Sequence, residues 1–261
     1  MAWARRAYDA LAVAFGYLGR PSYTLLIRAL DIPSRETGTA RLAGGGALIT
    51  VGNVFSADYD VQALHSLLVH EMGHQWTGQL TNGVEPWFAE GFNVFAETTV
   101  PCRASIMSWS DCAARINTQL EDLYRSEGRR WSLQQINAAG FDQEMVRRVP
   151  YGRGMLYFAS VDAQLLRRSS GRRGLLAALR PIFAARQAGA RFEQRDWEAL
   201  VARELGPEAV NTFRAVVIDG SEDPAMPQDL FGPQLHRVAH RWSTPQGEVD
   251  GYRWEAAPSD R

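Results

Sequence analysis

The sequence predicts an α+β fold in which a small mixed α/β lobe, about residues 1–100, precedes a mostly helical lobe, about residues 101–230. Three observations support this fold class. Runs rich in β-branched and aromatic residues, bounded by Gly or Pro, lie in the first 52 residues. After them, apolar residues recur at every third or fourth position, which is the spacing of helices. The chain of 261 residues is 46% hydrophobic and 22% charged, an ordinary globular composition, so we expect one domain.

The N-terminal segment, MAWARRAYDALAVAFGYLG, fits an amphipathic helix because Trp3, Ala7 and Ala14 share one helical face. The segment also resembles a secretory signal, with arginines ahead of an apolar run. Asp9 interrupts that pattern and no A-x-A-like site follows, so we expect a helix. The cellular compartment stays open, with export favoured over the cytoplasm.

Two strands are predicted next, at residues 23–30 and 44–51, separated by a polar loop. The first combines β-branched and aromatic residues and is closed by Asp31 and Pro33. The second is entered through three consecutive glycines, which allow its backbone to approach a ligand or a neighbouring chain segment closely.

Helical periodicity then begins at residues 59–80 and continues to the end of the second lobe. We expect Pro101 to stop the following helix, near residues 87–98. The last segment is rich in Pro, Gly and aromatic residues, so we expect residues 231–261 to form an irregular tail. The other predicted helices are residues 108–126, 150–168, 174–186, 194–205 and 207–218.

Charge argues against a nucleic-acid partner, and hydropathy argues against a membrane-spanning helix. The formal net charge is −1, and the chain lacks the basic patch of a nucleic-acid-binding protein. No apolar run approaches the ~20 residues that a membrane-spanning helix needs. Two cysteines, Cys102 and Cys112, have a spacing compatible with one disulfide or with a pair of free thiols.

A metal site is indicated by VHEMGHQW in the helix at residues 59–80. On a helix, His70 and His74 lie on one face, so both imidazoles can bind a single ion. Glu71 lies about 100° around the helix, where it can accept a proton from a water molecule instead of binding the metal. This arrangement is typical of metal-assisted hydrolysis, although two histidines on a helix can also simply pack or face solvent.

A third ligand would come from the next helix, where the sequence EPWFAEGFNVFAE offers Glu85, Glu90 and Glu97. Two helices packed antiparallel would bring one carboxylate to the pair of histidines and complete a His₂Glu site.

The residues of these two helices resemble the gluzincin metallopeptidases. HEMGHQWTGQ followed by WFAEGF is similar to the HExxHxW and W-x-x-EGF motifs of the aminopeptidase N family, with a shorter spacer between them. The resemblance implies a thermolysin-like metallopeptidase catalytic domain that acts on a peptide or protein. It also implies one Zn²⁺ per chain, bound by His70, His74 and Glu90.

Two later stretches extend the resemblance. Residues 149–154, VPYGRG, resemble V-P-Y-E-K-G of the same family, which implies that Tyr151 donates a hydrogen bond to the oxyanion of the reaction. Residues 213–220, followed by Pro224 and Pro227, resemble the related glycyl aminopeptidase family.

The chain departs from the family at the strand that lines the cleft. Relatives carry G-x-M-E-N there, and its glutamate binds the free amine of the substrate, whereas this chain has Gly44, Gly45, Gly46 and Ala47. We expect Gly45, Gly46 and Ala47 to contact substrate without that anchor. The resemblance favours an aminopeptidase; an endopeptidase of the same fold and a catalytically silent zinc-bearing domain are the alternatives.

Two other candidates, Glu97 and Arg153, have two interpretations each. Glu97 could orient a ligating histidine or be a solvated helix carboxylate. Arg153 could meet a substrate carboxylate near the cleft entrance or lie on the surface. For His65, Trp76 and Trp87 we expect packing roles.

Overall fold

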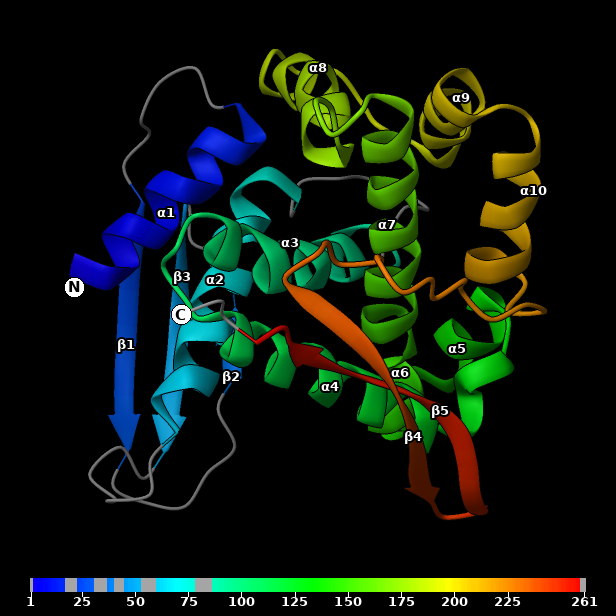
Figure 1. Cartoon of the computed structure of the whole chain (residues 1–261). Coiled ribbons are helices and arrows are strands. Elements are labelled where there is room, and N and C mark those ends of the chain that lie inside the picture. The colour runs from blue at the N-terminus through cyan, green and yellow to red at the C-terminus, as the bar shows by residue number, and fades with distance from the viewer. Residues whose placement is uncertain are drawn as a thin grey trace.

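The chain folds into a small sheet, a helical body and a C-terminal hairpin (Figure 1). The mixed architecture, mostly helical with two small sheets, agrees with the predicted fold class. In Figure 1 the sheet and the first helix lie on one side, and the later helices lie on the other. The structure is a computed structural model that describes residues 2–16, 23–30, 37–39, 45–52, 60–77 and 86–258.

The three-stranded sheet has the order β1-β3-β2. Strands β1 (Thr24–Leu30) and β3 (Gly46–Gly52) are parallel and match the two predicted strands. The short antiparallel strand β2 (Thr37–Thr39) lies in the segment expected to be a polar loop. Side chains of β3 alternate in burial as expected for a strand with one covered face, and those that are fully buried include Ala47, Ile49 and Val51.

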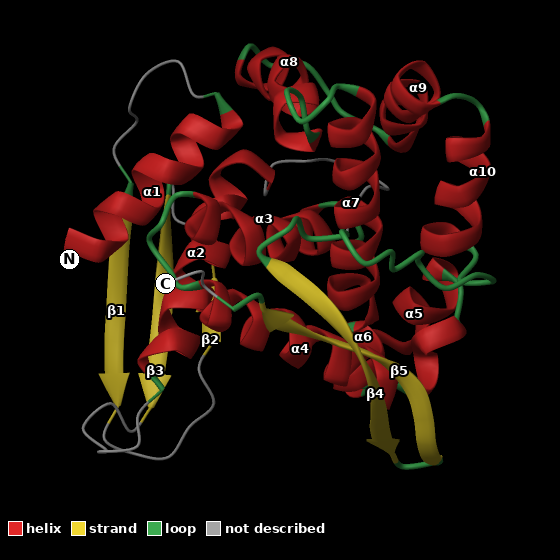
Figure 2. Ribbon diagram, in the orientation of Figure 1, coloured by secondary structure: helices red, strands yellow, loops and turns green. Residues whose placement is uncertain are grey.

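Helices make up most of the rest of the chain (Figure 2). The signal-like N-terminal segment forms α1 (Ala2–Phe15), with Leu11 and Phe15 buried. No helix among those described is long and apolar enough to cross a bilayer. The remaining helices are α2 (Val61–Thr77), α3 (Ala89–Arg103), α4 (Trp109–Arg125), α5 (Leu133–Ala139), α6 (Glu144–Arg147), α7 (Val149–Arg168), α8 (Leu175–Gln187), α9 (Gln194–Leu205) and α10 (Glu208–Phe213), with tighter or wider turns at Glu127–Arg130, Gly140–Asp142 and Arg214–Ile218.

The prediction that Pro101 stops α3 is wrong, because the helix continues through it to Arg103. The proline sits in the last turn, and the backbone N–H groups of Ala104 and Ile106 close that turn on carbonyls of Val100 and Pro101. A disulfide between Cys102 and Cys112 joins the end of α3 to the start of α4. Of the two alternatives for these cysteines, a disulfide or a pair of free thiols, the structure therefore shows the disulfide.

The prediction of an irregular tail is also wrong. Strands β4 (Leu235–Thr244) and β5 (Gly247–Ala256) form an antiparallel hairpin. It packs on α4, where the Asn117 amide donates to the carbonyl of Trp254 (2.9 Å) and accepts from its N–H (2.8 Å). The side chain of Trp254, on β5, is buried, and its ring lies 5.0 Å from that of Phe231, measured between centroids. Trp242, another aromatic residue of the segment that was expected to be an irregular tail, is also buried.

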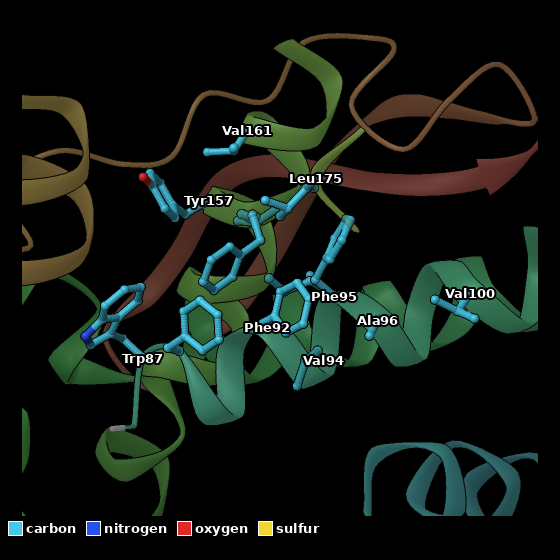
Figure 3. Close-up of a cluster of buried hydrophobic side chains, with 14 of the residues drawn as sticks. Trp87, Phe92, Val94, Phe95, Ala96, Val100, Tyr157, Val161 and Leu175 are labelled. Atoms are coloured by element: carbon cyan, nitrogen blue, oxygen red, sulfur yellow. The ribbon is translucent and has the colours of Figure 1, made fainter. Parts of the chain in front are cut away.

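An aromatic cluster holds α3 against α7 (Figure 3). Phe88 and Phe92 each lie 5.4 Å from Phe158, measured between ring centroids, and all three are fully buried. Trp87 packs into the same cluster from the end that precedes α3. This packing matters for function because α3 and α7 carry two of the predicted site residues.

Candidate metal centre

Helix α2 places the two predicted histidine ligands on one face. Its first turn is capped by Asp60, whose carboxylate accepts hydrogen bonds from the N–H groups of Gln62 (2.9 Å) and Ala63 (3.1 Å). The ring centroids of His70 and His74 lie 4.9 Å apart. Both side chains are largely buried, so they point into the protein.

Helix α3 brings Glu90 to the two histidines. Glu90 Oε2 lies 3.1 Å from His70 Nε2 and 3.6 Å from His74 Nε2. One ligand atom of each of the three residues lies within 4.8 Å of the others. Among the described residues, these three therefore form a group that could hold a metal ion. Glu85, the other carboxylate offered ahead of this helix, lies outside the described residues.

The Nδ1 atom of each histidine has a hydrogen-bond partner of its own, so Nε2 is the atom that each ring directs towards Glu90 and could offer to an ion. His70 Nδ1 lies 2.8 Å from Glu97 Oε2, and because a carboxylate only accepts, Nδ1 carries the proton. Thr77 donates its hydroxyl to Asn93 (3.0 Å) and can accept from His74 Nδ1 at 3.4 Å. The donor set, two imidazole nitrogens and a carboxylate oxygen, suits zinc.

Glu97 orients His70 and is not a solvated helix carboxylate. Its side chain is completely buried, and Arg115 on α4 makes an ion pair with its second oxygen, Oε1. Burial raises the pKa of Glu97, but the Arg115 charge and the bond to His70 more than reverse this effect and lower it. Glu97 is therefore ionised.

The electric field of the two carboxylates favours positive charge at this point. Burial lowers the pKa of His70, yet the hydrogen bonds and charges of Glu90 and Glu97 raise it to about 10. Burial likewise raises the pKa of Glu90, while the two histidines lower it strongly. A field that stabilises a protonated imidazole will also stabilise a bound cation.

Glu71 lies beside this group with an unsatisfied oxygen. Its side chain is buried, and Oε2 makes no hydrogen bond within the described part of the chain. Burial raises the pKa of this carboxyl, although the neighbouring histidines partly lower it. The helix is fixed on this side by Tyr23, whose hydroxyl donates to the Glu71 carbonyl at 3.0 Å. A buried carboxylate oxygen without a partner suits exchange of a proton with a bound water.

Tyr151, in the first turn of α7, faces the histidines. Its ring lies parallel to that of His70, with centroids 6.0 Å apart. Burial raises the pKa of the phenol and the Glu90 charge raises it further, whereas Arg147 lowers it. The hydroxyl is therefore a neutral hydrogen-bond donor at physiological pH.

Two glycines set the distance between α3 and α7. A Cβ atom on Gly91 would lie 2.7 Å from the Cα atom of Gly154 and 2.8 Å from the Pro150 carbonyl oxygen. The two backbones are thus in direct contact, one residue after Glu90 and three residues after Tyr151.

A pocket of about 380 Å³ opens beside Glu90 and Tyr151. Arg147 lines it and is held by two hydrogen bonds to Glu144, each 2.9 Å long. Sequence reasoning missed Arg147, because it lies in the short helix α6, ahead of the helix that was predicted to begin at residue 150. The other lining residues are Pro86, Ile136, Asn137 and Gly140.

The predicted substrate-contacting residues lie at the start of β3. Gly46 and Ala47 are buried, and Gly45 is half-buried with φ of 92°. A Cβ on Gly45 would lie 2.6 Å from Oε1 of Gln75, the residue after His74, so this stretch borders the ligand helix. Gly44 lies outside the described residues.

Arg153 fits neither of its predicted interpretations. It is 3% exposed, and its guanidinium donates to the carbonyls of Arg129 (2.6 Å) and Trp131 (2.8 Å). Burial lowers its pKa to about 10. The residue thus fastens α7 to the turn Glu127–Arg130 and cannot meet a substrate at the cleft entrance.

The packing roles expected for three other residues agree with the structure. Trp76 and Trp87 are 4% and 1% exposed. His65 stacks on Trp3, with ring centroids 3.7 Å apart.

Comparison with solved structures finds the same fold in known metallopeptidases. An aminopeptidase N family protein from Idiomarina loihiensis matches 98% of this chain with a TM-score of 0.74 and 13% identity, and 48% of that protein is covered. An M1 zinc metallopeptidase from Deinococcus radiodurans matches 86% of this chain with a TM-score of 0.55 and 21% identity, and 45% of it is covered. A mutant M1 zinc metallopeptidase from the same organism, bound to a Tyr-Ser-Ala substrate, gives a TM-score of 0.56 at 20% identity, with 85% and 44% coverage.

These matches confirm the aminopeptidase-N-like fold that the motifs implied. The chain spans about half the length of the structures that it matches. No protein-family model and no curated protein matches the sequence.

Proposed function

We propose that this chain is a zinc-dependent metallopeptidase of the gluzincin type, with a thermolysin-like catalytic fold, and that it acts as an aminopeptidase. The observation that carries the proposal is the convergence of His70, His74 and Glu90 in an aminopeptidase-N-like fold, with the buried Glu71 carboxylate on the same helix.

His70, His74 and Glu90 would hold one zinc ion. When bound, zinc supplies Lewis acidity, which polarises a substrate carbonyl and lowers the pKa of water. Glu97 and Thr77 keep the histidines in the tautomer that presents Nε2 to the ion.

Glu71 serves as general base and then as proton shuttle. Its unsatisfied Oε2 accepts the proton of the attacking water and then passes it to the leaving amine. Burial raises the pKa of this carboxyl towards neutral pH. A group whose pKa lies near the working pH can both take up and release a proton. Tyr151 donates a hydrogen bond to the oxygen that gains negative charge as the peptide carbonyl is attacked.

The position of cleavage depends on how the substrate amine is held. The fold favours an aminopeptidase, because structures of aminopeptidase N and M1 proteins share it. The segment at Gly45, Gly46 and Ala47 provides no carboxylate to bind an amine, which favours an endopeptidase as the second candidate. Peptides with free and blocked amino termini separate these two activities.

The test is a mass-spectrometric cleavage profile of the zinc-loaded protein on a peptide library with free and acetylated N-termini. Glu71→Gln, which keeps the size of the side chain but removes its basicity, is the matched control. Loss of single residues from free amino termini alone supports an aminopeptidase. Internal cleavage that is insensitive to acetylation indicates an endopeptidase. Cleavage no greater than that of the control would refute both and leave a silent zinc-bearing domain.

A further inference from the structure

The buried carboxylate of Glu97 contacts Arg115 as well as His70, and Arg115 lies outside the motifs that predicted the metal ligands. Its Oε2 is bound to His70 Nδ1 at 2.8 Å, and its Oε1 is paired with Nε of Arg115. The Glu97 side chain is completely inaccessible to solvent. A buried carboxylate is costly unless it is paired and hydrogen-bonded, and here Arg115 supplies the neutralising charge.

Arg115 is itself held in place and does not move freely at the surface. Its side chain is only 23% exposed. It lies on α4, a helix that carries none of the proposed ligands. When the amide of Gln119 is oriented to satisfy its neighbours, its oxygen accepts from Nη1 at 3.1 Å and from Nη2 at 3.2 Å. Gln119 is buried one helical turn later, so the guanidinium is fixed on two sides.

We propose that Arg115 is a positioning residue that sets the metal affinity of this centre through Glu97. Arg115 orients the Glu97 carboxylate, Glu97 orients the His70 ring, and the ring presents Nε2 to the ion. The inference rests on the proposed function only in taking His70 as a ligand. Groups that orient ligating histidines typically change metal affinity about 10–100-fold when they are mutated.

A separate covalent link opposes separation of the two helices when the ion pair is broken. The disulfide between Cys102 and Cys112 joins the same two helices that Glu97 and Arg115 connect. Removing the guanidinium therefore leaves α3 and α4 attached to each other. We expect Arg115→Met to keep the helix pair while freeing the Glu97 carboxylate to rotate.

The experiment measures the zinc dissociation constant of the whole chain by competition with a chromophoric chelator. We expect Arg115→Met to weaken zinc binding about 10-fold or more, and Arg115→Lys to recover part of the loss. Arg125→Met is the matched control, because Arg125 lies on the same helix and pairs with Glu121 at the surface (3.0 Å). The control should bind zinc as the parent does. An unchanged or tighter constant for Arg115→Met would overturn the proposal.

A double-mutant cycle tests the route through Glu97. In a Glu97→Gln background, Arg115→Met should cause no further loss of zinc affinity. A further loss of the same size as in the parent would show that Arg115 acts by another path. The absorption spectrum of the cobalt-substituted protein provides a second readout, since it should change in Arg115→Met but not in Arg125→Met. None of these measurements requires peptide cleavage, so the inference can stand even if the proposed peptidase activity is not found.

Discussion

The contact between Gly91 and Gly154 makes the geometry of the centre sensitive to a single methyl group. In Gly91→Ala, the new Cβ would lie 2.7 Å from Gly154 Cα, while ordinary contacts begin at 3.4 Å, so the helices must separate by about 0.7 Å. Such overpacking costs about 1–3 kcal/mol of unfolding free energy. Because Glu90 precedes Gly91, the shift would also move Glu90 relative to Tyr151. Misplacing a reacting group by about 1 Å can cost ~100-fold in rate, so we expect kcat/KM to fall roughly 10–100-fold.

The assay for Gly91→Ala combines thermal unfolding with peptide hydrolysis at saturating zinc. Gly189→Ala is the control, since its Cβ would meet nothing within 4 Å and only the φ of 90° opposes the change. We expect that control to lose stability through backbone strain while keeping its activity. If Gly91→Ala unfolds earlier but hydrolyses peptides at the parent rate, the helix contact does not position the site and the reasoning is refuted.

Three further predictions concern the site and its support. Glu71→Gln should retain zinc, measured by metal analysis, and lose about 10²–10⁴-fold in kcat; parent-like turnover would exclude its role as general base. Tyr151→Phe should lower kcat about 10²–10³-fold with little change in KM, as expected for a group that acts on the substrate only through the oxyanion, and a change confined to KM would contradict this. Replacing Cys102 and Cys112 with serine opens a loop with a sequence separation of 10, which should reduce the free energy of unfolding in denaturant titrations by about 2.5–3 kcal/mol.

The helix that carries the two candidate histidines was predictable because its pattern is local in the sequence. The spacing of His70 and His74 determines which face they share once the segment is helical, and apolar periodicity identifies the helix. Glu90 could be ranked above its neighbours only through the family resemblance, because periodicity alone left three carboxylates as candidates. The role of Glu97 required tertiary packing, which determines whether a helix carboxylate is buried or solvated.

The missed features depend on partners distant in the sequence. Strand β2 exists because three residues pair with β3, and Thr37–Thr39 carry no periodicity of their own. The C-terminal hairpin was not predicted because the segment that contains it is rich in Pro and Gly, which indicate irregular structure. Its docking depends on Asn117, more than one hundred residues earlier in the sequence. Arg153 was misplaced because its hydrogen-bond acceptors are backbone carbonyls, which leave no signature in side-chain composition.

Helix α4 connects the last strand of the chain to the candidate centre. Its Asn117 binds the backbone of β5, and its Arg115 binds the carboxylate behind His70. Docking of the hairpin contacts α4 directly, and an ion bound by His70 would be linked to the same helix through Glu97. Coupling free energies between two binding events are reciprocal. Any factor by which detaching the hairpin weakens zinc binding must equal the factor by which zinc strengthens hairpin docking, and amide exchange in β5 would report it.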